Sequence, residues 1–68
     1  MDRLKLEYEI KRNGYTIGEI CEILGISRSA FYRKIRGISE FTQGEISILI
    51  DTLHLENPWE IFFKNQVS

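Results

Sequence analysis

The sequence predicts an all-α protein, a compact bundle of four to five short helices in one domain spanning residues 1–68. Two patterns carry this prediction: helix-start signals recur along the chain, and glycines follow the apolar-periodic segments. A third, the apolar spacing at i, i+3 and i+4, fits helices throughout. With 68 residues and 43% hydrophobic content, the chain is long enough for one small core.

The first segment, residues 3–13, has two interpretations. Leu4, Leu6, Tyr8 and Ile10 alternate with mostly charged residues, as in a strand. The same residues form the i,i+4 pairs Leu4–Tyr8 and Leu6–Ile10, which suit a helix. We favour the helix, because no other segment is predicted to form a strand that could pair with this one.

The next helix starts are explicit. Residues 15–20 (YTIGEI) and 41–46 (FTQGEI) share one pattern, in which a Thr and a Glu three residues later form a capping box. Ser27 can cap a further helix, and Asn57 followed by Pro58 marks the last one. Helix ends are indicated at Asn13-Gly14, Gly25 and Gly37. The predicted helices are therefore 17–24, 28–36, 43–53 and 58–64.

Composition limits the function classes. The lone Cys21 excludes an internal disulfide and favours a reducing, cytoplasmic setting. With a single His54 far from Cys21, the sequence offers little for a metal site or a nucleophile–base pair, so we expect neither an enzyme nor a cofactor. No apolar run approaches the roughly 20 residues of a membrane span, so we expect no membrane association.

Charge is distributed unevenly. The net charge is −1, yet residues 28–36 hold four basic residues and no acidic one, while residues 37–63 hold five acidic residues and no Lys or Arg. Because phosphate attraction acts over about 8–10 Å, this local block matters more than the total.

Residues 16–36 read as two short helices joined at a corner. Cys21 is small enough for a close helix crossing, Gly25 suits the turn, and Phe31 and Ile35 form an apolar stripe on the second helix. The opposite face then carries a basic, hydrogen-bonding strip: Arg28, Ser29, Tyr32, Arg33 and Arg36. Such a face, held outward by a corner, suits a nucleic-acid groove.

The run Thr-x-x-Glu-Ile-x-x-x-Leu-Gly-Ile-Ser-x-Ser-x-Phe at 16–31 resembles the XRE-type helix-turn-helix domains of phage repressors and Cro proteins. The Phe-Thr-x-x-Glu-Ile start at 41–46 and the Ile-Phe-Phe at 61–63 also resemble short phage and prophage members, and the likeness covers about residues 4–63. It implies a lambda repressor-like fold that binds operator DNA, usually as a dimer, with 28–36 as the recognition helix. It further implies a cytoplasmic, nucleoid-associated transcription regulator.

Candidate roles follow for the strip. Arg28, Ser29, Tyr32 and Arg33 are candidate base contacts, since Arg can bind guanine bidentately. Lys34, Arg36 and the backbone N–H groups near Ile17, Gln43 and Gly44 are candidate phosphate contacts. Two departures from the family pattern limit the transfer: Ile17 stands where Gln is common, and Ile35 where an acidic residue is common.

A module of this size contacts few base pairs, so we expect a homodimer on a two-fold operator and no small-molecule ligand. Interface candidates are Ile48, Trp59, Phe62 and Phe63. Core closure is the favoured role for the three aromatics, and whichever of them is exposed becomes the interface candidate. The alternative function is a protein-interaction module on the same scaffold that does not bind DNA.

Overall fold

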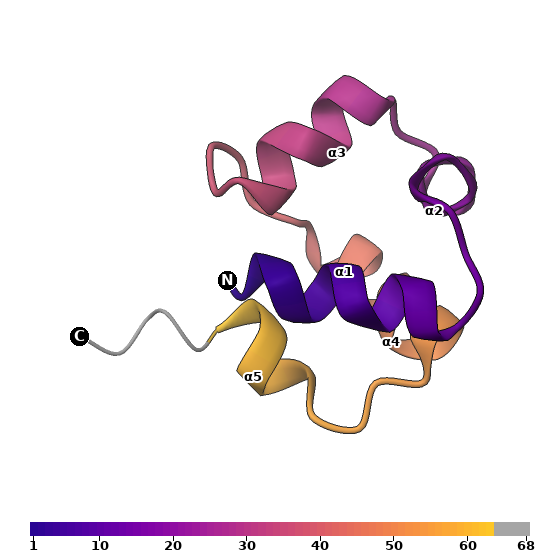
Figure 1. The fold of residues 1–68 in the computed structure, drawn as a ribbon. Helices are drawn as coiled ribbons and strands as arrows, with labels where there is room; N and C mark the ends of the chain where they lie inside the picture. Colours follow the sequence, from indigo (N-terminus) through magenta and orange to yellow (C-terminus); the bar gives the residue numbers. More distant parts are fainter. Residues whose placement is uncertain (64–68) are drawn as a thin grey trace.

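The computed structural model describes residues 1–63, and these fold entirely into helices and connecting turns (Figure 1). The elements are α1 (Arg3–Arg12), α2 (Ile17–Leu24), α3 (Arg28–Ile35), α4 (Gln43–Leu53) and α5 (Pro58–Phe62). The all-α prediction is confirmed, and the first segment is a helix rather than a strand. The bounds predicted for the second and fourth helices coincide with α2 and α4.

Side-chain caps fix where the helices begin. Thr16 and Thr42 each form the predicted capping box with Glu19 and Glu45, and Ser27 Oγ accepts the N–H of Ala30. The prediction for Asn57 is only half met, because it occupies the cap position of α5 without a side-chain hydrogen bond.

The start of α1 depends on a cap that our sequence reading missed. Asp2 Oδ1 accepts the N–H of Lys5 at 3.1 Å.

Two helices end slightly earlier than predicted. Helix α3 ends at Ile35, with Arg36 as its C-cap, and α5 ends at Phe62. Residue 64, in the predicted last helix, lies outside the described residues.

Left-handed residues terminate the first four helices. Gly14, Gly25 and Gly37 have φ of 81°, 72° and 85°, as the sequence indicated. His54 ends α4 at φ 52°, a conformation that costs a non-glycine residue some backbone strain. The N–H of Leu55 still bonds the carbonyl of Ile50 at 3.1 Å, so the chain turns as it does after the glycines.

The core combines residues from all five helices. Its members are Leu6, Ile10, Ile20, Cys21, Leu24, Phe31, Ile35, Leu49, Leu53, Ile61 and Phe62. Ile23 is 42% exposed, because α2 packs on one side only, through Ile20, Cys21 and Leu24.

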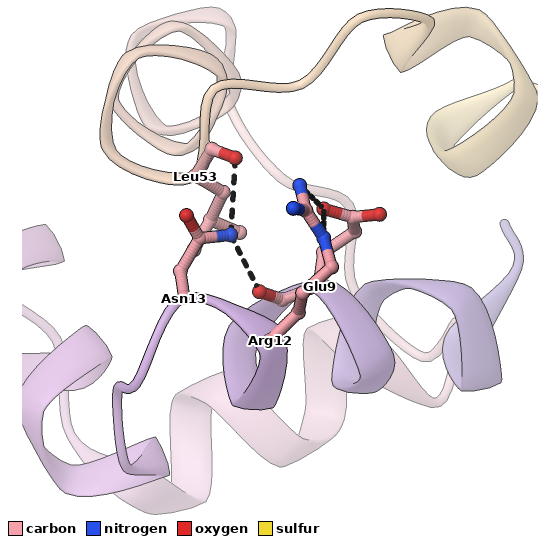
Figure 2. A network of polar contacts seen from close by, with 4 residues as sticks. All are labelled: Glu9, Arg12, Asn13 and Leu53. Carbon is pink, nitrogen blue, oxygen red and sulfur yellow. Dashed lines mark hydrogen bonds and ion pairs between the residues drawn. The ribbon is translucent and has the colours of Figure 1, made fainter.

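Polar contacts fix α1 against the C-terminal half of the chain. The side-chain amide of Asn13 donates to the carbonyls of Glu9 and Leu53, joining the ends of α1 and α4 (Figure 2). Nearby, Arg12 pairs with Glu9 at 2.8 Å. The N–H of Asp2 bonds the carbonyl of Ile61, so α5 is held against the start of α1. These contacts leave α3 at the opposite edge of the molecule from α5 (Figure 1).

Among residues 1–63, no helix is both long and apolar enough to cross a membrane.

Candidate nucleic-acid interface

A tight corner joins α2 to α3. Gly25 adopts the left-handed conformation, and the N–H of Ile26 bonds the carbonyl of Cys21 at 3.0 Å. Cys21 is 4% exposed where the two helices pack, as its small size allows. Ser27 then caps α3 immediately after the turn. Because each residue of the corner is fixed by a hydrogen bond or by packing, α3 has a defined direction relative to α2.

The two faces of α3 differ completely. Phe31 is fully buried and Ile35 is 3% exposed, which anchors the inner face in the core. The outward strip is exposed as predicted: Arg28, Ser29, Tyr32, Arg33 and Arg36. Tyr32 is 44% exposed. Its ring packs edge-on against the buried ring of Phe31, with 5.9 Å between the ring centroids.

The chain's acidic residues do not neutralise this strip. On α1, Arg3, Lys5 and Arg12 pair with Glu7, Glu60 and Glu9. By contrast, Arg28, Arg33 and Arg36 have no carboxylate partner among the described residues. A guanidinium without an internal partner keeps all five N–H donors available to a ligand. Below, "the arginine strip" means these three residues together with Ser29 and Tyr32.

Lys34 differs from its neighbours on α3. Its Nζ donates to Glu45 Oε1 at 2.9 Å and to the carbonyl of Glu40 at 3.3 Å, and its side chain is 14% exposed. Lys34 is a candidate phosphate contact in the sequence analysis. Its ammonium is already paired with Glu45 and largely covered, which weighs against that contact. Lys34 instead fastens α3 to the start of α4.

Glu45 receives this ammonium while also serving the capping box of α4. Its Oε1 accepts the backbone N–H of Thr42 at 2.9 Å as well as Lys34 Nζ. Burial acts to raise the pKa of the Glu45 carboxyl, but the hydrogen bonds from Lys34 and Thr42 outweigh it, and the net pKa is lowered.

Helix starts supply the remaining candidate phosphate contacts. The capping box of α2 engages the N–H groups of Thr16 and Glu19, which leaves those of Ile17 and Gly18 outside it. At the start of α4, Gln43 and Gly44 are exposed. Ile17 is partly buried against the core, so only its backbone is suited to the expected contact.

The aromatic residues of α5 separate into core and surface. Phe62 is 7% exposed and takes the core role that the sequence analysis left open for it, because its ring packs against Phe41 and Phe63. Trp59 is 61% exposed and tilted over Phe63 at 4.9 Å between centroids. Phe63 is partly buried, and Ile48 is 37% exposed.

Metal and thiol chemistry find little support in the described residues. No group of three His, Cys, Asp or Glu side chains within residues 1–63 could hold a metal ion. Burial raises the pKa of the Cys21 thiol, although the positive charge of Arg28 acts in the opposite direction. The buried thiol is therefore harder to ionise than an exposed one.

Comparison with known proteins supports the same corner. Residues 10–37 match the helix-turn-helix domain of resolvase. Searches of curated proteins and of solved structures found no significant match. The match spans the end of α1, α2, the turn and all of α3, which are the elements that present the arginine strip. The protein is therefore an all-helical chain built around a helix-turn-helix, similar over residues 10–37 to that of resolvase.

Proposed function

We propose that this protein is a sequence-specific regulator of transcription that inserts α3 into the major groove of an operator, in the manner of Cro and phage repressors. The observation that carries the proposal is the charge pairing. The chain has a net charge of −1. Within residues 1–63, the three arginines of the arginine strip are the arginines left exposed and without a carboxylate partner, on a capped helix at one edge of the fold.

The strip offers chemistry both for base edges in the major groove and for the phosphate backbone. Arg28 and Arg33 can each donate bidentately to guanine O6 and N7, a contact worth about 1–3 kcal/mol of discrimination. Ser29 can bind a base edge, and Tyr32 can contact a thymine methyl. Arg36, at the end of α3, is placed to neutralise a phosphate, which positions the helix without reading sequence.

We propose further that the protein binds as a homodimer on a two-fold site, since one short helix reads few base pairs. Trp59 and Ile48 are the exposed apolar candidates for the subunit contact. The proposal needs no cofactor or small-molecule ligand and places the protein with DNA in the cytoplasm. Sedimentation with a selected palindromic duplex tests it: two protomers per duplex are expected, and one protomer with no preference for symmetry contradicts dimeric binding.

Salt-dependent titration tests the main proposal. A duplex is first selected from a random pool with the wild-type protein, and its affinity is then measured by fluorescence anisotropy at several salt concentrations. A steep negative slope of log K against log [salt] is expected, because each neutralised phosphate contributes about −0.9. Arg36→Ala should make the slope shallower by about 1 and weaken all sequences alike.

Arg12→Ala is the matched control. It also removes one exposed arginine, but that residue pairs with Glu9 and points toward the segment between α4 and α5 (Figure 2). Its slope should remain that of the wild type. If the wild-type protein selects no duplex, or binds with a slope near zero, DNA binding is contradicted and the alternative of a protein-interaction module gains support.

A further inference from the structure

Arg28 lies across the first turn of α2. A Cβ atom built on Gly18 would stand 2.5 Å from Arg28 Nη2, 3.4 Å from its Cζ and 3.5 Å from its Nε. Ordinary van der Waals contact of a Cβ atom lies at 3.4–4 Å, and real Cβ atoms essentially never come within 3.0 Å of another heavy atom. The guanidinium therefore occupies space that exists only because residue 18 has no side chain.

The second copy of the same pattern shows that the helix start does not itself need this glycine. Gly44 has the same position in the capping box of α4 as Gly18 has in that of α2. A Cβ on Gly44 would meet only Thr42 Oγ1, at 3.9 Å, which is ordinary contact. Neither Gly18 nor Gly44 has the positive φ that favours glycine, so local backbone geometry permits Ala at both.

We propose that Gly18 is a positioning residue for Arg28: the missing side chain lets the guanidinium lie on α2, pre-oriented for its DNA contact. The inference rests on the proposed function and deepens it. Arg28 is exposed and has no hydrogen-bond partner among the described residues, so the α2 surface, rather than a carboxylate, limits its rotamers. An arginine already restricted in the free protein loses less conformational freedom when it binds.

Substituting Ala for Gly18 should move Arg28 and little else. The nearest atoms belong to the far end of a flexible side chain, which can swing away without disturbing the backbone. Ala is also the better helix former, so α2 should not be weakened. Gly44→Ala makes the same chemical change at the matched position and is the control for folding and for the Arg28 conformation. Because the Gly44 N–H is itself a candidate phosphate contact, affinities are compared with the wild-type protein.

The free protein provides the first measurement. In NMR spectra, the wild-type protein and Gly44→Ala should show NOEs between the Hα protons of Gly18 and the side chain of Arg28. Absence of these NOEs in the wild-type protein overturns the inference before any DNA is added. In Gly18→Ala the Arg28 Nε–H resonance should shift, while thermal unfolding should stay at or above that of the wild type.

The second measurement is affinity for the duplex that the wild-type protein selects. Immobilising one long side chain corresponds to about a 2- to 10-fold change in affinity. We expect Gly18→Ala to bind at least threefold more weakly than the wild-type protein, and Gly18→Ala combined with Arg28→Ala to match Arg28→Ala alone.

The two levels of failure are distinguishable. If Arg28→Ala weakens binding but Gly18→Ala lies within threefold of the wild-type protein, or if the Gly18 and Arg28 effects add, the positioning role is overturned and the proposed function stands. If the wild-type protein selects no duplex, the proposed function fails and the inference fails with it.

Discussion

Replacing Glu45 by Gln separates two roles that this carboxylate combines. Gln can still accept the N–H of Thr42 within the capping box, but it cannot form an ion pair with Lys34. Glu19 has the same place in the capping box of α2 and has no cation partner among the described residues. Glu19→Gln is therefore the matched control, and the difference between the two variants measures the Lys34–Glu45 pair.

The expected magnitude follows from burial. Exposed ion pairs contribute about 0–1 kcal/mol, whereas removing one partner of a fully buried pair costs about 3–5 kcal/mol. Lys34 and Glu45 have side chains 14% and 13% exposed, so the pair lies between these limits, and about 2 kcal/mol is expected. For a protein of this size, that lowers the melting temperature by roughly 8–16 °C.

Urea unfolding as a function of pH is the assay. The pKa of Glu45 is lowered in the folded state, so its contribution is fully present above the unfolded value of about 4.3 and is lost as pH falls through the folded value. Wild type and Glu45→Gln should differ by about 2 kcal/mol at pH 7 and converge in strong acid. If Glu45→Gln costs no more than Glu19→Gln at pH 7, or if the difference persists after acidification, the ion pair does not hold α3 to α4.

Three further predictions follow from the same contacts. Lys34→Met should lower the free energy of unfolding, measured in urea, by about 1–3 kcal/mol and leave the salt slope of DNA binding unchanged. Arg36→Ala should leave the free energy of unfolding unchanged and make the salt slope shallower. A salt slope altered by Lys34→Met would restore the phosphate contact expected from the sequence. Asp2→Ala removes the cap of α1 and should cost about 1 kcal/mol in urea, so an unchanged midpoint would show that this cap is not stabilising. Trp59→Ser should leave the free energy of unfolding within about 0.5 kcal/mol of the wild-type value, because the ring is largely exposed. It should reduce binding to a palindromic duplex more than binding to a half-site. An equal loss of binding to both duplexes would place Trp59 outside the subunit contact.

Local chemistry made much of the fold predictable. A capping box requires only residues three apart, and a glycine C-cap requires only one residue, so the starts of α2 and α4 and the end of α2 follow from short sequence windows. The cap at Asp2 is of the same kind, an acidic residue directly before the first helix, and its signal is visible in the sequence although our reading omitted it. The outward face of α3 was predictable because Phe31 and Ile35 fix which side is buried.

The remaining features depend on tertiary arrangement. Lys34 meets Glu45 across a turn, and the sequence cannot distinguish this lysine from the three arginines near it. Trp59 and Phe62 are three residues apart and equally apolar, yet only packing reveals that one is exposed and the other buried. Gly18 has the same local sequence pattern as Gly44, and only the path of Arg28 across α2 gives it a different role.

Methylation interference tests the central claim most directly. Dimethyl sulfate modifies guanine at N7 in the major groove and adenine at N3 in the minor groove, and the two grooves can therefore be probed on one selected duplex. If α3 reads the major groove through Arg28 and Arg33, N7 methylation should block binding at discrete guanines, and Arg33→Ala should abolish the effect at one position in each half-site. Interference confined to adenine N3, or none at any guanine, would contradict this account.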